Sequence, residues 1–197
     1  MTKKFTLYEL LLIAGLSAIG LAIKPIINPF IHLISSGLRI PGGSLTGGFL
    51  MIWPAFTRIY IDKPGSALIF GLTQGMVVIM LGFFGSHGIF SLVTYTMPCL
   101  VIEILALLLG IPNFFCSLPA VRREPRGKME TKRKSLLVIC TYCVGANVTG
   151  SLLVALMIMQ LPLIMLSITT ISAIISGLMG GYCGWLVMEK LAKYRVF

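Results

Sequence analysis

Neutral polar and aromatic side chains recur in the apolar segments of this chain and in the turns between them, and they are the residues best suited to bind a small solute. They are Trp53, His87, Tyr95, Asn147 and Thr170. Two of them lie near a proline, Pro54 or Pro98, and a proline within a helix leaves a backbone carbonyl free to accept a hydrogen bond from a guest. This set suits a small ring-containing organic molecule better than a metal ion or a strongly charged substrate. The alternative for each hydroxyl is an ordinary hydrogen bond between helices.

Ionisable residues are scarce within the apolar segments. Glu103 is the only acidic residue well inside one of them. Because an ionisable group at membrane depth is costly, it marks either a structural hydrogen bond or a site or coupling role, and both stay open. Arg58 and Asp62 are four residues apart near the end of another segment, and this spacing predicts an ion pair on one helix.

The sequence lacks the common catalytic patterns. It has no paired-carboxylate metal motif, no GxSxG with a partnering histidine, no HExxH and no phosphate-binding Walker loop. Cys140 and Cys143 have CxxC spacing, but they lie on an apolar segment without a second pair, which favours packing. We therefore expect no enzyme activity, no metal and no cofactor, so an ATP-powered process would need other subunits.

Six apolar segments must position these residues. They cover residues 5–23, 43–61, 65–84, 89–109, 135–159 and 161–188. Hydrophobic residues make up 57% of the chain and charged residues 11%, which leaves too little polar surface for a water-soluble globule. A helix of about 20 apolar residues crosses a bilayer. The sequence thus predicts an all-α membrane protein, a single domain of six transmembrane helices.

The basic residues predict the orientation of this bundle. With a cytoplasmic N-terminus, all but two of the sixteen Lys and Arg residues lie on the inner side, the exceptions being Lys24 and Arg39. The positive-inside rule then places both termini in the cytoplasm, at the cell membrane. Contact with anionic lipid explains the net charge of +10 better than nucleic acid, for which the chain has no binding module.

Two connections between the segments are long. Residues 24–42 are interrupted by Pro25, Pro29 and Pro41, so we expect an outer loop after the first helix that folds over the mouth of the bundle. Residues 110–134 are rich in basic side chains, which predicts a solvated cytoplasmic loop between the fourth and fifth helices.

Small residues give the first helix one flat side. Ala14, Ala18 and Ala22 follow one another at steps of four, so they lie on one face. In lipid, flat faces let helices approach closely, because their association depends on van der Waals packing. Residues 177–184 of the last segment are similarly rich in glycine. Packing within the bundle and docking of another membrane protein both remain open.

Several motifs occur at the places where one transporter family carries them. They are Ala14-x-x-x-Ala18 with Ala22, Gly180-Gly-Tyr-Cys-Gly184 before a short basic tail, Ile52-Trp-Pro54, and Tyr60-Ile-Asp-Lys-Pro-Gly65. With the chain length and six spans, they resemble the substrate-binding (S) components of energy-coupling factor (ECF) vitamin transporters. The two internal motifs are most similar to the branch associated with thiamine-precursor uptake, although this chain lacks that branch's acidic residues in the third span.

The resemblance implies a mechanism. A vitamin or vitamin precursor would bind in a pocket that opens outward beneath a lid, here residues 29–41. The bundle would then dock through Ala14, Ala18 and Ala22 onto a transmembrane scaffold subunit with two ATPase subunits, and ATP hydrolysis would deliver the solute inward. The predicted pocket residues are Trp53, Gln74, His87, Tyr95, Asn147 and Thr170.

Two alternatives belong to other functional classes. In a self-contained secondary transporter, Glu103 would serve as a proton relay. An accessory or structural subunit of a membrane complex would explain the small-residue faces without any pocket.

Overall fold

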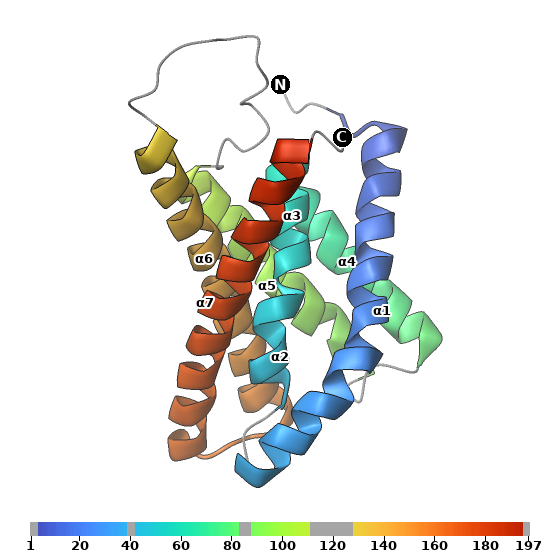
Figure 1. The fold of residues 1–197 in the computed structure, drawn as a ribbon. Coiled ribbons are helices and arrows are strands. Elements are labelled where there is room, and N and C mark those ends of the chain that lie inside the picture. The colour runs from blue at the N-terminus through green and yellow to red at the C-terminus, as the bar shows by residue number, and fades with distance from the viewer. Residues whose placement is uncertain (1–3, 39–41, 83–87, 111–127, 195–197) are drawn as a thin grey trace.

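The computed structural model describes residues 4–38, 42–82, 88–110 and 128–194, which form a helical bundle without strands (Figure 1). In chain order its elements are α1 (Leu7–Leu38), α2 (Gly42–Leu50), α3 (Ile52–Ile61), α4 (Ser66–Leu81), α5 (Phe90–Leu109), α6 (Lys128–Leu153), the π-helical turn η1 (Val154–Ile158) and α7 (Leu163–Tyr194). The start of α1 and the end of α7 lie at the same end of the bundle, which we call the terminal end (Figure 1).

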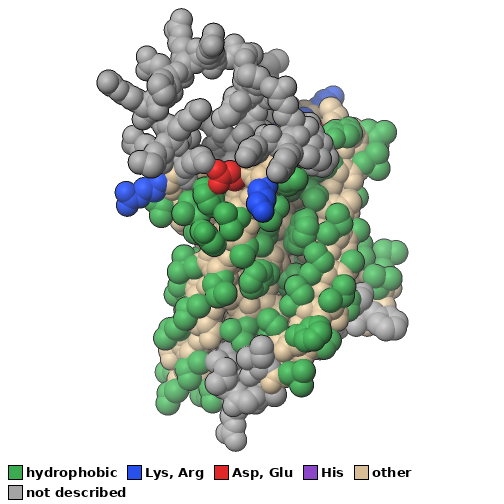
Figure 2. Space-filling model, viewed as in Figure 1, with side chains coloured by type: hydrophobic (Ala, Val, Ile, Leu, Met, Phe, Trp, Pro, Cys, Tyr) green, Lys and Arg blue, Asp and Glu red, His purple; other side chains and the backbone are tan. Residues whose placement is uncertain are grey.

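The surface of the bundle is compatible with a membrane protein. Four described stretches are long and apolar enough to cross a bilayer: Leu7–Ile31, Phe90–Leu109, Arg133–Ile158 and Leu163–Leu191. The shorter α4 is also apolar. Figure 2 shows hydrophobic side chains over most of the visible face, with described charged groups only near the terminal end. The all-helical architecture predicted from the sequence is confirmed.

The first helix is longer than predicted, and most of the expected outer loop is helical. α1 continues through Pro25 and Pro29 to Leu38, so the predicted loop is wrong up to that residue, and residues 39–41 lie outside the described part. The predicted lid is therefore mainly the last turns of α1. Each proline removes one backbone hydrogen bond, but both losses fall on one side of the helix because the prolines are four residues apart. Figure 1 shows α1 bending in this half.

The second predicted span, residues 43–61, is two helices rather than one. α2 and α3 are separated at Met51. Pro54 has no N–H to donate to the carbonyl of Leu50, so the hydrogen-bond ladder is interrupted there. It resumes at once, since the N–H of Ala55 donates to the Met51 carbonyl at 3.3 Å.

The fifth predicted span begins earlier than expected. α6 starts at Lys128 rather than at residue 135, so the end of the expected basic loop is helical. This extension contains Met129, Glu130 and Lys132, which are good helix formers. Residues 111–127, which include the rest of that loop, lie outside the described part.

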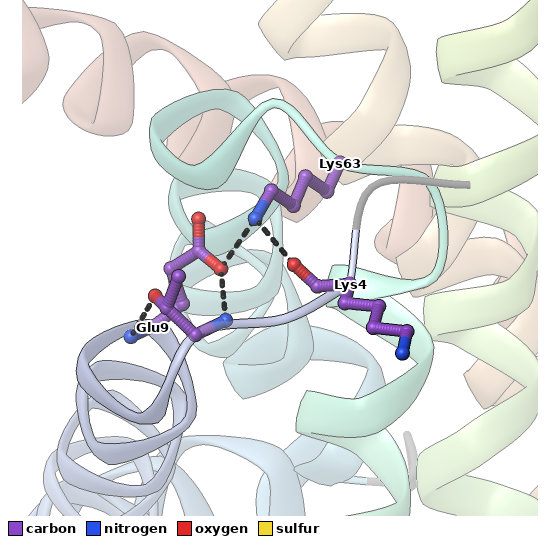
Figure 3. Close-up of polar contacts among 4 residues, drawn as sticks. Lys4, Glu9 and Lys63 are labelled. Atoms are coloured by element: carbon purple, nitrogen blue, oxygen red, sulfur yellow. Dashed lines mark hydrogen bonds and ion pairs between the residues drawn. The ribbon is translucent and has the colours of Figure 1, made fainter. Parts of the chain in front are cut away.

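The start of α1 is fixed by a capping box. The Thr6 hydroxyl accepts from the N–H of Glu9 at 3.3 Å, and the Glu9 carboxylate accepts from the N–H of Thr6 at 2.8 Å. The same carboxylate oxygen pairs with Lys63 Nζ at 2.6 Å, and Lys63 also donates to the Lys4 carbonyl at 3.0 Å (Figure 3). These contacts attach the beginning of α1 to the turn between α3 and α4.

Glycines bring α7 against two neighbours at backbone distance. A Cβ on Gly180 would lie 2.0 Å from the Gly48 carbonyl oxygen of α2. A Cβ on Gly181 would lie 2.6 Å from the Cα of Cys140 in α6. Ser176 reinforces the first crossing, because its hydroxyl accepts from the Gly48 N–H at 3.2 Å. For these glycines, packing within the bundle is the interpretation that the structure shows.

Candidate functional site

A cavity of about 340 Å³ lies among α1, α2, α4, α5 and α6. Its walls come from the middle of α1, from α2 and the beginning of α3, from Gln74 of α4, from the first half of α5, and from the end of α6 with η1. These parts lie away from the terminal end (Figure 1). The volume falls within the range of sites that bind small organic molecules.

The cavity wall is rich in polar groups for so apolar a bundle. Side chains with nitrogen or phenolic oxygen are Lys24, Asn28, Gln74, Tyr95 and Asn147. Hydroxyl groups come from Ser44, Thr46, Ser91, Thr94 and Ser151. Buried polar groups need hydrogen-bond partners, so a cavity with this lining favours a guest that also carries donors and acceptors.

Two glycines make room for the amide side chains of the wall. A Cβ on Gly20 would lie 2.7 Å from Gln74 Nε2, and a Cβ on Gly47 would lie 1.9 Å from Asn147 Oδ1.

Both amide side chains of the wall are anchored by hydrogen bonds to backbone carbonyls. Gln74 Nε2 donates to the Ser17 carbonyl at 3.2 Å. Asn147 Nδ2 donates to the carbonyls of Ser44 at 3.1 Å and Ala173 at 2.8 Å. These bonds fix the orientation of both amides and join α6 to α2 and α7.

Three of the six predicted pocket residues line this cavity, namely Gln74, Tyr95 and Asn147. Trp53 lies just behind the wall, with its Cδ1 3.4 Å from the position of a Cβ on Gly20. Thr170 is not in the wall, and its hydroxyl donates to the Leu166 carbonyl of its own helix at 2.8 Å. His87 lies outside the described residues.

Lys24 also lines the cavity, although the sequence placed it only in an outer loop. Its ammonium donates to the Tyr95 hydroxyl at 2.6 Å and lies 3.8 Å from the centre of the Tyr95 ring. One signal in the sequence pointed to it. Lys24 is one of two basic residues on the side that the positive-inside rule disfavours, and such an exception calls for a local reason.

Glu103 holds a buried ion pair, but with a partner that the sequence did not suggest. Its Oε2 contacts Arg58 Nε at 2.8 Å, and its Oε1 accepts from the Ala67 N–H at 2.8 Å. Ala67 is in the first turn of α4, where the helix dipole favours a negative charge. Of the two roles left open for Glu103, the structure shows the structural hydrogen bond.

The predicted pair between Arg58 and Asp62 is wrong. α3 ends at Ile61, and Asp62 takes a left-handed conformation with φ of 50°, so the helical spacing that would bring the two side chains together is lost. Asp62 is exposed, whereas the Arg58 side chain is only 4% exposed and is directed to α5.

The alanine face of α1 is exposed. Ala14, Ala18 and Ala22 are all exposed, while the neighbouring Ile13 and Ser17 are buried. Gly15 has open space beside it, since a Cβ there would meet nothing within 4 Å. Among the described residues, the structure therefore does not show these alanines packed inside the bundle.

Within the described residues, no group of three or more His, Cys, Asp or Glu side chains is placed to hold a metal ion. Comparisons with protein-family models, with curated proteins and with solved structures find no match to this chain.

Proposed function

We propose that this chain is the substrate-binding subunit of an ATP-driven importer of the ECF type, which takes up a small vitamin or vitamin precursor. The observation that carries the proposal is the polar cavity of about 340 Å³ inside an otherwise apolar helical bundle. A purely structural subunit has no need of such a cavity. The anchoring of Glu103 by Arg58 and the Ala67 N–H also weighs against a proton relay and hence against a secondary transporter.

The proposed topology has six crossings with both termini in the cytoplasm. α1, α4, α5 and α7 each make one crossing, α2 and α3 together make one, and α6 with η1 makes the last. The distribution of Lys and Arg residues supports this orientation. Because the cavity is in the half of the bundle away from both termini, this orientation places it on the outer side, where an importer captures its solute.

The exposed alanine face supports docking to a membrane partner. Ala14, Ala18 and Ala22 leave a shallow surface on α1, and close approach of such surfaces gives van der Waals energy that large side chains would prevent. The chain has no phosphate-binding loop, so the energy must come from partner ATPases. In the proposal, a helix of the scaffold subunit covers this face, and the scaffold subunit in turn binds two ATPase subunits.

Binding of a vitamin-sized solute is tested by thermal unfolding of the purified full chain in detergent against a panel of B vitamins and their precursors. A ligand that binds only the folded state at 100 times its Kd adds about 2.7 kcal/mol of stability. We expect one compound to raise Tm by several degrees. Gln74→Leu, in the wall, should reduce that shift, and Thr170→Val, outside the wall, should leave it unchanged. A folded protein that responds to no compound would contradict solute binding.

Docking is tested by adding bulk to the alanine face. We expect Ala18→Leu to weaken association with the scaffold about 10- to 100-fold, because overpacking a close contact costs about 1–3 kcal/mol. Copurification with an ECF scaffold and its ATPases should fall, whereas the ligand-induced Tm shift should stay the same. Ile171→Phe adds bulk to an exposed site on α7 and should change neither. Equal loss of copurification in both variants would argue against a specific α1 interface.

A further inference from the structure

The described cavity wall carries a positive charge without a compensating carboxylate. Lys24 is in the wall, and no Asp or Glu is among the residues that line it. The acidic residue of α5, Glu103, lies one turn beyond Cys99 and is already paired with Arg58. The two amides and the hydroxyl groups of the wall are neutral, so the described lining has a net charge of one positive unit when Lys24 is protonated.

The position of Lys24 is defined by Tyr95. The ammonium lies 2.6 Å from the phenol oxygen and 3.8 Å from the ring centre, so both the hydroxyl and the ring face contribute to holding it. A phenol oxygen and a π face attract a cation, but neither neutralises it. An ammonium at membrane depth is costly without a counter-charge, and such groups commonly mark substrate pathways.

The first turn of α2 adds to the positive potential of this cavity. Gly42, Gly43 and Ser44 line it, and they form the amino end of a nine-residue helix. A helix amino end carries a partial positive charge. Lys24 and this turn therefore favour the same sign of charge in the guest. The sequence-based expectation that a strongly charged substrate would fit poorly rested on a pocket without Lys24.

We propose that the cavity binds a small organic molecule with one carboxylate group, and that this carboxylate pairs with Lys24 beside Tyr95. The inference rests on the proposed binding function and narrows its substrate class. One ammonium balances one carboxylate, whereas a phosphate monoester carries about −1.5 to −2 charges at neutral pH and would leave an excess negative charge in the cavity. The neutral amides Gln74 and Asn147 face the uncharged remainder of the molecule.

The test uses matched pairs of vitamin-sized probes that differ only in the charged group. Nicotinate with nicotinamide, pantothenate with panthenol and lipoate with lipoamide are each titrated against the full chain, followed by Tm and by isothermal calorimetry. Pyridoxal phosphate provides a phosphate arm and thiamine a cationic arm. We expect one carboxylate to bind at least tenfold more tightly than its neutral partner, because hydrogen bonds to charged groups contribute about 1.5–3 kcal/mol.

Variants then assign the preference to Lys24. Lys24→Met should weaken binding of that carboxylate about 10- to 100-fold and change binding of the neutral partner less than about threefold, while Lys24→Arg should keep part of the preference. Lys63→Met removes a lysine at the terminal end of the bundle and should leave the preference intact. The Tm of unliganded Lys24→Met should be unchanged or higher, since an uncompensated, partly buried charge has been removed.

Several outcomes would overturn the inference. Preferred binding of a neutral compound, thiamine or the phosphate ester would reject a carboxylate substrate and leave the proposed importer in place. A lower Tm in Lys24→Met with an undiminished carboxylate preference would show that Lys24 only supports the fold. Absence of binding by every probe to the folded protein would count against both the carboxylate site and the proposed function.

Discussion

Replacement of Glu103 by leucine is expected to destabilise the protein by about 3–5 kcal/mol, the usual cost of breaking a buried ion pair from one side. The variant leaves the Arg58 side chain, 4% exposed, without its carboxylate. It also removes the acceptor of the Ala67 N–H in the first turn of α4. Both donors would then lie in an apolar environment without a partner. Reversible unfolding in mixed detergent measures the loss.

The double variant Arg58→Met with Glu103→Leu distinguishes the cost of leaving one partner unpaired from the contribution of the ion pair itself. Because apolar replacement of both partners of a buried pair is often close to neutral, we expect it to be more stable than Glu103→Leu alone. Asp62→Asn is the matched control. Asp62 is exposed and follows the end of α3, so its replacement should stay within about 0.5 kcal/mol. A cost for Asp62→Asn equal to that of Glu103→Leu would contradict the observed pairing.

Hydropathy predicts where most of the helices are, because burial in lipid or in the bundle demands an apolar run of a certain length. α5 starts and ends close to the predicted residues 89–109. The helix ends near prolines are harder to predict. Pro25 and Pro29 were expected to end α1, yet the helix bends and continues, whereas Pro54 does separate α2 from α3. A proline removes one hydrogen bond in each case, and tertiary contacts decide whether the chain continues.

The contrast between local sequence patterns and tertiary contacts also explains which site residues could be predicted. Gln74, Tyr95 and Asn147 are polar groups within apolar segments, and the cost of burying them already suggested a shared purpose. Lys24 becomes a wall residue only because α1 remains helical past Pro25. It is four residues after Gly20, so a continuous helix turns both toward the cavity. The Arg58 and Glu103 pair joins residues 45 positions apart, and no local pattern encodes it.

Gly180→Ala is expected to destabilise the bundle by roughly 3 kcal/mol or more, through a clash between two backbones. The added Cβ would lie 2.0 Å from the Gly48 carbonyl oxygen and 3.0 Å from the Phe49 nitrogen. Neither atom is the end of a flexible side chain, so α2 and α7 must separate. Their separation would also break the bond from the Gly48 N–H to the Ser176 hydroxyl. Thermal unfolding of the purified variant, with helicity followed by circular dichroism, measures the effect.

Gly15→Ala makes the same chemical change on α1, at a site where the new methyl group meets nothing within 4 Å. Alanine is favoured over glycine within a helix by about 1 kcal/mol, so this control should be neutral or slightly stabilising. Gly184→Ala lies between these cases, because the atoms nearest to its Cβ belong to the Ile52 side chain, the closest at 3.2 Å. The expected order of stability is therefore Gly15→Ala, then Gly184→Ala, then Gly180→Ala. If Gly180→Ala were as stable as Gly15→Ala, α2 and α7 could not cross at backbone contact, and the α2 wall of the cavity would have to lie farther from α7.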